Sequence, residues 1–152
     1  MQAHQLASPY PTVRMDTPAA EAVRVLTEHN RPGLIVVDDN EHPLAILPGS
    51  QVLRMLIPRY VQDDPTLARV LDEAFADKMS EALADKTVRD LMPKDKVPLP
   101  VVAPDDTMLE IAAIMAANRS PLVAVVEERS RTAPLIGAIS VSQLLGRVLP
   151  EA

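Results

Sequence analysis

Apolar and polar positions along the first third of the chain follow two periods in turn. Over 18–29 the apolar side chains recur every three to four residues, which predicts an amphipathic helix. The runs 34–37 and 44–47 are short and aliphatic, and turn residues separate them, so they predict two buried strands. From 49–57 the helical spacing returns, and Pro58 ends it. This stretch therefore predicts the order helix, strand, strand, helix.

The same order returns in the last third of the chain, with clearer signals at the helix ends. Thr107 and Glu110 have the spacing of a capping box, so a helix begins there. The segments 121–126 and 135–139 predict a second pair of strands, and 141–149 predicts the last helix. With one strand ahead of the first helix, each half is predicted to contain a strand, a helix, two strands and a helix.

The two halves also share identical residues in register. Ser, Gln, Leu and Pro of 50–58 return 92 positions later in 142–150. Further upstream the offset is 89, because one turn is three residues longer in the second copy, and loops absorb insertions easily. Copies this short lie near the lower limit of independent folding, so we expect them to pack on each other. The predicted organisation is 1–58 for the first unit, 59–86 for a helical linker and 87–152 for the second unit.

The linker has an apolar pattern of its own. Asp64 and Pro65 have the chemistry of a helix cap followed by a first-turn proline. The apolar face of the stretch that follows comprises Leu67, Val70, Leu71, Ala74 and Phe75. Its other face is charged, which is most simply a solvated surface. We expect one helix over 66–84, placed to cap a dimer or to engage a different protein.

Composition restricts the partners and the compartment. The net charge is -6 and aromatic residues make up 2% of the chain, which argues against a nucleic-acid partner, because such a partner needs a basic surface or stacking aromatics. The chain has no cysteine, as is typical of a reducing compartment. The apolar runs are too short to span a bilayer, and the N-terminal residues do not resemble a signal peptide. We expect a cytoplasmic protein with no direct membrane insertion.

The sequence lacks the motifs that indicate catalysis or metal binding. His4, His29 and His42 show no metal-ligand spacing, and no cysteine joins them. The four glycines form neither a phosphate-binding loop nor a nucleophile elbow. The acidic pairs 38–39 and 105–106 fall in turn and cap positions. We therefore predict no catalytic residue, no metal site and no required cofactor.

Order, spacing and duplication together resemble a known family. A duplicated β-α-β-β-α unit with a Val-Arg-Asp-Leu-Met lead-in at 88–92, an Asp-Asp-Thr helix start at 105–107 and Gly-Ala-Ile-Ser at 137–140 is similar to a pair of cystathionine β-synthase (CBS) domains. The resemblance covers about 12–58 and 87–150, and it leaves the central helix unaccounted for. It implies an α/β (α+β) fold in which two tandem units pack sheet to sheet, with the helical linker inserted between them.

The resemblance also implies a ligand site in the cleft between the units, for AMP, ADP, ATP or S-adenosylmethionine. In ligand-binding members a strand ends in Gly-x-x-Thr/Ser-x-x-Asp, whose hydroxyl meets a phosphate or ribose oxygen and whose carboxylate accepts from the ribose. The second copy here reads Gly137, Ser140, Gln143, and the first copy reads Ala, Pro and Gln51, so the carboxylate is missing twice. The candidate ligand-binding residues are Ser140, Gln143, Arg119, Pro121, Ile139 and Gln51.

Each of these residues also has a structural interpretation. Ser140 and Gln143 have the residue types that cap and line the start of a helix. Pro48 stands three residues before Gln51, where the motif has its hydroxyl, and it removes both that hydroxyl and a backbone N–H, so a structural role is favoured for Gln51. Arg119 lies at a helix end, where it either meets a phosphate or interacts with the helix dipole. Loss of the aspartate removes a charge-assisted bond worth roughly 1.5–3 kcal/mol, which weakens ribose binding.

The duplicated last helices predict self-association. In CBS pairs these helices typically form the contact between two chains, so the resemblance implies a symmetric homodimer. The candidate interface residues are Val52, Leu53, Leu56, Ile57, Leu144, Leu145, Val148 and Leu149. An enzyme with no recognisable nucleophile or metal site is the least favoured hypothesis, and two others stay open beside it. One is a non-catalytic module that binds an adenosine-containing ligand and signals to a partner enzyme or transporter, and the other is a nucleotide-free adaptor that works through dimerisation and interaction.

Overall fold

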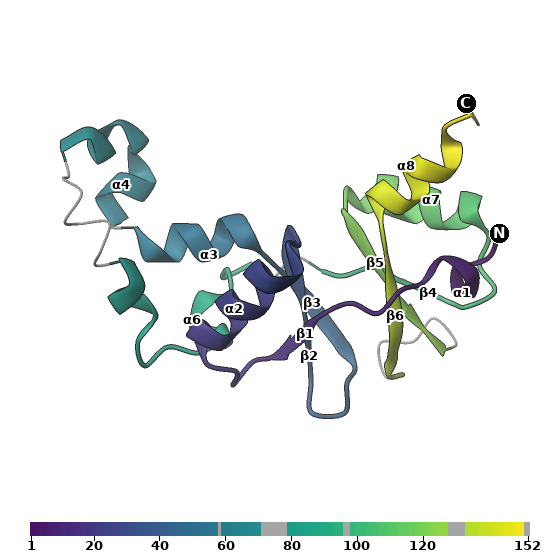
Figure 1. The fold of residues 1–152 in the computed structure, drawn as a ribbon, viewed down its shortest axis with the longest axis horizontal. Helices are drawn as coiled ribbons and strands as arrows, with labels where there is room; N and C mark the ends of the chain where they lie inside the picture. Colours follow the sequence, from purple (N-terminus) through teal and green to yellow (C-terminus); the bar gives the residue numbers. More distant parts are fainter. Residues whose placement is uncertain (58, 71–78, 96–97, 128–132, 151–152) are drawn as a thin grey trace.

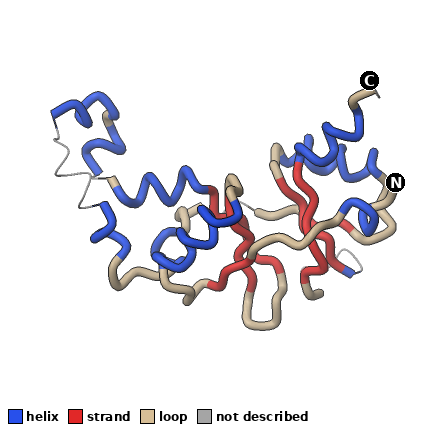
Figure 2. Tube along the Cα trace, in the orientation of Figure 1, coloured by secondary structure: helices blue, strands red, loops and turns tan. Residues whose placement is uncertain are grey.

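Two three-stranded sheets stand next to each other, and helices cover the outer face of each (Figures 1 and 2). The structure, a computed structural model, describes residues 1–57, 59–70, 79–95, 98–127 and 133–150. The elements in chain order are α1 (Ala3–Leu6), β1 (Thr12–Arg14), α2 (Ala19–His29), β2 (Gly33–Val37), β3 (Pro43–Pro48), α3 (Gly49–Leu56), α4 (Arg59–Asp63), the 3₁₀ helices η1 (Pro65–Val70) and η2 (Met79–Leu83), α6 (Val88–Leu91), β4 (Val101–Val102), α7 (Met108–Asn118), β5 (Leu122–Val126), β6 (Leu135–Ser140) and α8 (Val141–Val148). The expected α+β fold of two tandem units is confirmed.

The first unit contains the sheet β1-β2-β3, in which β2 is parallel to β1 and antiparallel to β3. The turn between β2 and β3 depends on Asp38, whose Oδ1 accepts the backbone N–H groups of Asn40 and His42, both at 2.9 Å. The hydrogen bond from the His42 backbone is the main reason that the pKa of Asp38 lies below its ordinary value. The predicted strands 34–37 and 44–47 are confirmed within β2 and β3.

The second unit repeats the first down to its backbone irregularities. Its sheet has the order β4-β5-β6 with the same strand directions. The pairing of β2 with β3 shifts register after Val36, and the pairing of β5 with β6 shifts after Val125. Helices α2 and α7 both end at a residue in the left-handed conformation, Asn30 and Arg119, each with φ of 49°. The duplication seen in the sequence therefore extends to these special backbone positions.

The inner faces of the two sheets form one shared core. Alternate residues of a strand point to opposite faces, and this divides β2 between two clusters. Leu34 and Val36 pack under the helices of the first unit, whereas Ile35 and Val37 face the other sheet. The shared cluster consists of Ile35, Val37, Ile46, Leu99, Leu122, Ala124, Val126 and Ala138. The predicted sheet-to-sheet packing is thus confirmed, and it explains why all five residues of β2 and of β5 are buried.

Each unit takes its leading helix from the other half of the sequence. Ala3 and Leu6 of α1 belong to the core cluster of the second unit, and Val88 and Leu91 of α6 belong to that of the first. Figure 1 shows α1, in purple, beside the green strands and helices of the second unit. The boundaries 1–58 and 87–152 describe the repeats along the sequence, whereas in space the units exchange these short helices.

Matching backbone hydrogen bonds hold the two exchanged helices. The Ala3 N–H donates to the Asp106 carbonyl at 2.9 Å, and the Val88 N–H donates to the Thr17 carbonyl at 2.9 Å. Both acceptors lie just ahead of the long helix of the unit, α7 or α2. The same backbone hydrogen bond therefore holds α1 against the second unit and α6 against the first unit.

The linker does not form one continuous α-helix over 66–84. Its described ends are the 3₁₀ helices η1 and η2, and residues 71–78 lie outside the described residues. The predicted apolar positions Leu71, Ala74 and Phe75 lie there too. At the start, the Oδ1 of Asp64 accepts both the backbone N–H and the hydroxyl of Thr66, so it caps a turn as expected. Leu83 packs against the core of the first unit.

Candidate functional site

Ser140 and Gln143, the strongest candidates from the sequence, form a capping box at the start of α8. The Gln143 N–H donates to Ser140 Oγ at 3.3 Å, and the Ser140 N–H donates to Gln143 Oε1 at 2.8 Å. The amide Nε2 of Gln143 donates to the Leu6 carbonyl at 3.0 Å. Gln143 thus connects the end of α1 to the start of α8, and both side chains are engaged inside the protein.

Gln51 makes the equivalent bond in the first unit. Its Nε2 donates to the carbonyl of Leu91, the last residue of α6, at 3.2 Å. Pro48 stands at the N-cap of α3 and makes no side-chain cap bond. An ionised aspartate has no side-chain N–H to donate, so it could not make these two bonds, whereas the amide of a glutamine can. The residues at the family's aspartate position therefore tether the exchanged helices.

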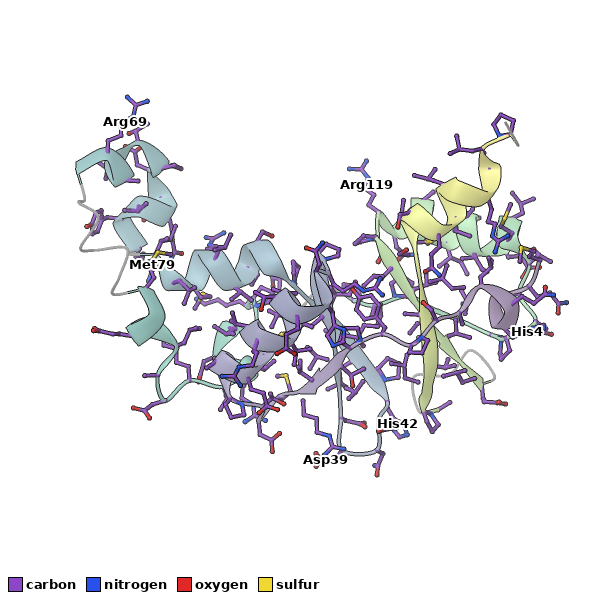
Figure 3. All side chains as sticks on the ribbon, viewed as in Figure 1. His4, Asp39, His42, Arg69, Met79 and Arg119 are labelled. Atoms are coloured by element: carbon purple, nitrogen blue, oxygen red, sulfur yellow. The ribbon has the colours of Figure 1, made fainter. Side chains whose placement is uncertain are left out.

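The remaining ligand candidates lie apart from this pair. Ile139 is fully buried in the core of the second unit, so its side chain is closed to a ligand. Arg119 and Pro121 are exposed and line an apolar groove between α7 and α8, together with Leu144 and Val148. Figure 3 shows the Arg119 side chain projecting from the end of α7. The structure thus brings Arg119 and Pro121 together with residues that the sequence assigned to a dimer interface.

The eight candidate interface residues divide into core and surface. Val52 and Leu144 are buried, and Leu56 and Ile57 are half-buried. Leu53, Leu145, Val148 and Leu149 are 60%, 59%, 67% and 71% exposed, which is unusual for large aliphatic side chains clustered on short helices.

The groove between α7 and α8 has a volume of about 480 Å³. Its lining combines small residues of α7, Ala112 and Ala116, with large residues of α8, Leu145 and Val148. In the first unit, η2 contacts α3, and Leu83 packs with Met55 and Leu56. Helix η2 of the linker (59–86) therefore covers part of the helical face of the first unit. The equivalent face of the second unit, between α7 and α8, stays open.

A second cavity, of about 560 Å³, lies beside Gln51. Arg54, Arg59 and Lys94 line it, and none of them was singled out from the sequence. Arg59 stands in the inserted segment and Lys94 in the loop after α6. Arg59 lies in the linker and Lys94 in a loop that is longer than the corresponding loop after α1, so the residues shared by the two copies gave no signal for either position.

The described residues contain no group of three or more His, Cys, Asp and Glu side chains that suits a metal ion. His4 hydrogen-bonds the Pro104 carbonyl through Nδ1 at 2.8 Å, and His42 pairs with Asp38 at 3.1 Å. Figure 3 shows these two histidines on different parts of the molecule. No helix in the described ranges is long and apolar enough to cross a membrane.

The comparisons with known proteins agree with this architecture. The family model described as CBS domain matches residues 4–57 and 88–150. A CBS domain-containing protein of unknown function from Kribbella flavida is 51% identical with a TM-score of 0.88, and the match covers 99% of each chain. The CBS domain of a CBS domain-containing membrane protein from Sphaerobacter thermophilus is 25% identical with a TM-score of 0.72, and the match covers 99% of this chain and 90% of that one.

CBSX2 in complex with AMP is 18% identical with a TM-score of 0.65, and the match covers 97% of this chain and 95% of that one; CBSX2 is a CBS-pair protein from Arabidopsis thaliana. The search of curated proteins finds no match. The family model matches well over half of the residues, in two segments that coincide with the two structural repeats. This chain therefore belongs to the CBS domain family and is a tandem CBS pair.

Proposed function

We propose that this chain is a non-catalytic regulatory module that works by association, through the apolar surface between α7 and α8. The observation that carries the proposal is the open groove of about 480 Å³ with Leu145 and Val148 exposed at its rim. Burying such a side chain contributes roughly 1.5–3 kcal/mol, so a surface of this kind favours a covered state.

The occupant that fits this surface is a second copy of the chain. A two-fold contact needs projections and hollows on the same patch, so that each copy fills the other. The large side chains of α8 and the alanines of α7 provide both within one groove. Among the residues that the structure describes, Arg119 is the single charged side chain that lines the groove, so we expect little self-repulsion between two such surfaces. The assembled dimer would then bind and regulate a partner enzyme or transporter.

The test is the oligomeric state, measured by light scattering after size exclusion. We expect wild-type protein to be a dimer and Leu145→Asp to be a monomer, because the aspartate would be desolvated in the interface. Ile136→Asp is the matched control, since Ile136 is 50% exposed and does not line the groove. The variant Leu53→Asp tests whether α3 also contributes to the dimer interface. A wild-type monomer, or a Leu145→Asp variant that remains dimeric, would rule out this surface.

A second candidate function is binding of an adenosine-containing ligand such as AMP, ADP, ATP or S-adenosylmethionine between the units. Its support is the hydroxyl of the half-buried Ser140 at the end of β6, together with the AMP complex of CBSX2, a protein of the same fold. The engagement of Gln51 and Gln143 in helix tethering speaks against it.

Calorimetric titration with these four compounds, using wild type and Ser140→Ala, separates the two functions. A sensor would bind one compound selectively and would lose affinity in the variant. An adaptor would bind none of them and would show in the variant only the small loss of stability that accompanies a missing helix cap, about 0.5–2 kcal/mol.

A further inference from the structure

We propose that only the helical face of the second unit, between α7 and α8, binds a second copy of the chain, and that the linker (59–86) closes the equivalent face of the first unit. This inference rests on the dimer proposed above and assigns its interface to one half of each chain. The duplication allows each position to be compared with its counterpart. Helices α2 and α7 both have 11 residues and end at a left-handed residue, Asn30 or Arg119, so an offset of 89 aligns them.

The exposed surfaces of α2 and α7 differ in kind. Three exposed positions of α2 are polar or charged, whereas their three exposed counterparts on α7 are alanines. The aligned pairs are Arg24 with Ala113, Thr27 with Ala116 and Glu28 with Ala117. Burying the charged side chains of α2 in an interface would cost free energy, because charged groups lose their hydration there. The alanines of α7 carry no such cost, and a helix that is apolar on nearly all sides is typical of a buried position.

The ends of α3 and α8 carry the same apolar pattern but differ in what covers it. Leu56 and Ile57 of the first unit are half-buried. Their counterparts at the offset of 92, Val148 and Leu149, are 67% and 71% exposed. In the first unit Leu83 of η2 packs in the same cluster as Leu56. The linker thus shields, within one chain, the positions that a second copy would shield in the second unit.

One aliphatic side chain of the first unit, Leu53, is still 60% exposed. The next residue along α3 is the exposed Arg54, and the apolar residues that follow are half-buried. Single exposed aliphatic residues are common on protein surfaces and do not indicate an interface. On α8, in contrast, Leu145 and Val148 are both exposed and line one groove. Of the two helices, α8 therefore presents the larger apolar surface.

The position of the linker has a consequence for the whole assembly. Figure 1 places α4 at the opposite end of the long axis from α7 and α8, and Figure 3 shows Arg69 of η1 at the same end as α4. A two-fold contact through α7 and α8 therefore holds the two linkers far apart, at the outer ends of the dimer. A contact that also used α3 would instead bring each linker close to the partner copy.

The first test compares equivalent substitutions in the two units, by light scattering over a dilution series. Ala116→Arg should raise the dissociation constant of the dimer by about a hundred-fold, because Ala116 lines the groove and the arginine would be desolvated there. Thr27→Arg places the same side chain at the exposed counterpart on α2 and should leave the constant unchanged. Leu53→Asp, the counterpart of Leu145→Asp, should also leave it unchanged. Arginine is a good helix former, so both helices should keep their fold, which circular dichroism checks.

The second test measures the distance between the two linkers of a dimer. The chain has no cysteine, so Arg69→Cys and Arg147→Cys each provide a single attachment site for a spin label. Both arginines are exposed, and neither lines the groove. Pulsed electron paramagnetic resonance should give a shorter distance between two labels at position 147, on α8, than between two labels at position 69, on η1.

The outcomes separate this inference from the proposed function. A wild-type monomer would overturn both, because both require self-association. A wild-type dimer that Thr27→Arg or Leu53→Asp dissociates would overturn only the inference, since it would place the first unit in the interface. Labels at position 69 as close as those at position 147 would overturn it for the same reason. Wild-type affinity of the Ala116→Arg variant would place α7 outside the contact and would overturn it as well.

Discussion

Gln51 and Gln143 perform the same task at equivalent positions of the two units. Each side-chain amide donates to the last carbonyl of an exchanged helix, at 3.2 Å for Leu91 and 3.0 Å for Leu6. Carbonyls at a helix end have no partner within the helix, so such a bond satisfies a group that otherwise needs water or a cap. At the scale of single residues, these glutamines stabilise the contact between the halves of the chain.

Replacing Gln143 by glutamate tests this task with little change of shape. The carboxylate keeps an acceptor for the Ser140 N–H but cannot donate to the Leu6 carbonyl. We expect the free energy of unfolding at pH 7 to fall by about 1–3 kcal/mol, measured by urea denaturation. A variant as stable as wild type would show that the bond to Leu6 contributes nothing.

The pH dependence of the Gln143→Glu variant provides its control. A carboxylate facing a carbonyl has a raised pKa in the folded state, so the penalty is present at neutral pH and disappears as the pH falls below the unfolded value of about 4.3. The difference from wild type should therefore shrink in acid, where the protonated carboxyl regains a donor. A difference that is constant with pH would indicate a purely steric effect.

At the scale of elements, the exchanged helices α1 and α6 depend on their surroundings. Each has four residues, and isolated helices of this length do not form in water. Two features stabilise these helices in the protein. Each helix begins with a capping box, at Gln2 or Thr87, and each packs a leucine, Leu6 or Leu91, into the core of the opposite unit. Helix α1 is therefore part of the core of the second unit, and α6 is part of the core of the first unit.

Leu6→Ala measures this contribution. Leu6 is 5% exposed in the core of the second unit, so we expect a loss of about 2–5 kcal/mol of unfolding free energy. Leu109→Ala is the matched control, because Leu109 is 79% exposed and its truncation should change stability by less than about 0.5 kcal/mol. Equal effects of the two substitutions in thermal unfolding would show that α1 does not belong to that core.

The sequence predicted the elements that periodicity and duplication mark, such as β2, β5 and the helices α2 and α7. It did not predict the exchange of α1 and α6, because that depends on contacts between residues far apart in the sequence, 40 positions for Gln51 with Leu91 and 137 for Gln143 with Leu6, which leave no local pattern. For the same reason, the sequence indicated a role for Gln143 only through its place in a ligand-binding motif, and it did not predict the hydrogen bond to Leu6. Ile139 was proposed as a ligand-binding residue, but strand alternation directs its side chain into the core of the second unit.

At the scale of the whole molecule, the two units are halves of one folding body. The shared cluster between the sheets includes Ile35 and Ile46 from one unit and Leu122 and Val126 from the other. Figure 1 places α4 at one end of the long axis and α7 with α8 at the other. Helix α4 and the proposed association surface therefore lie at opposite ends of the molecule, and the sheet-to-sheet core lies between them.

Leu34→Ala tests whether the units unfold together. Leu34 packs only in the first unit's own cluster, so its truncation, at about 2–5 kcal/mol, removes contacts from that unit alone. Because the shared core makes unfolding cooperative, we expect hydrogen exchange during urea denaturation to report one midpoint for β2 and β5, shifted by the same amount in both strands. If the midpoint of β2 moved while that of β5 stayed in place, the units would unfold independently, and a change in the first unit would not be transmitted through the sheets to the surface at α8.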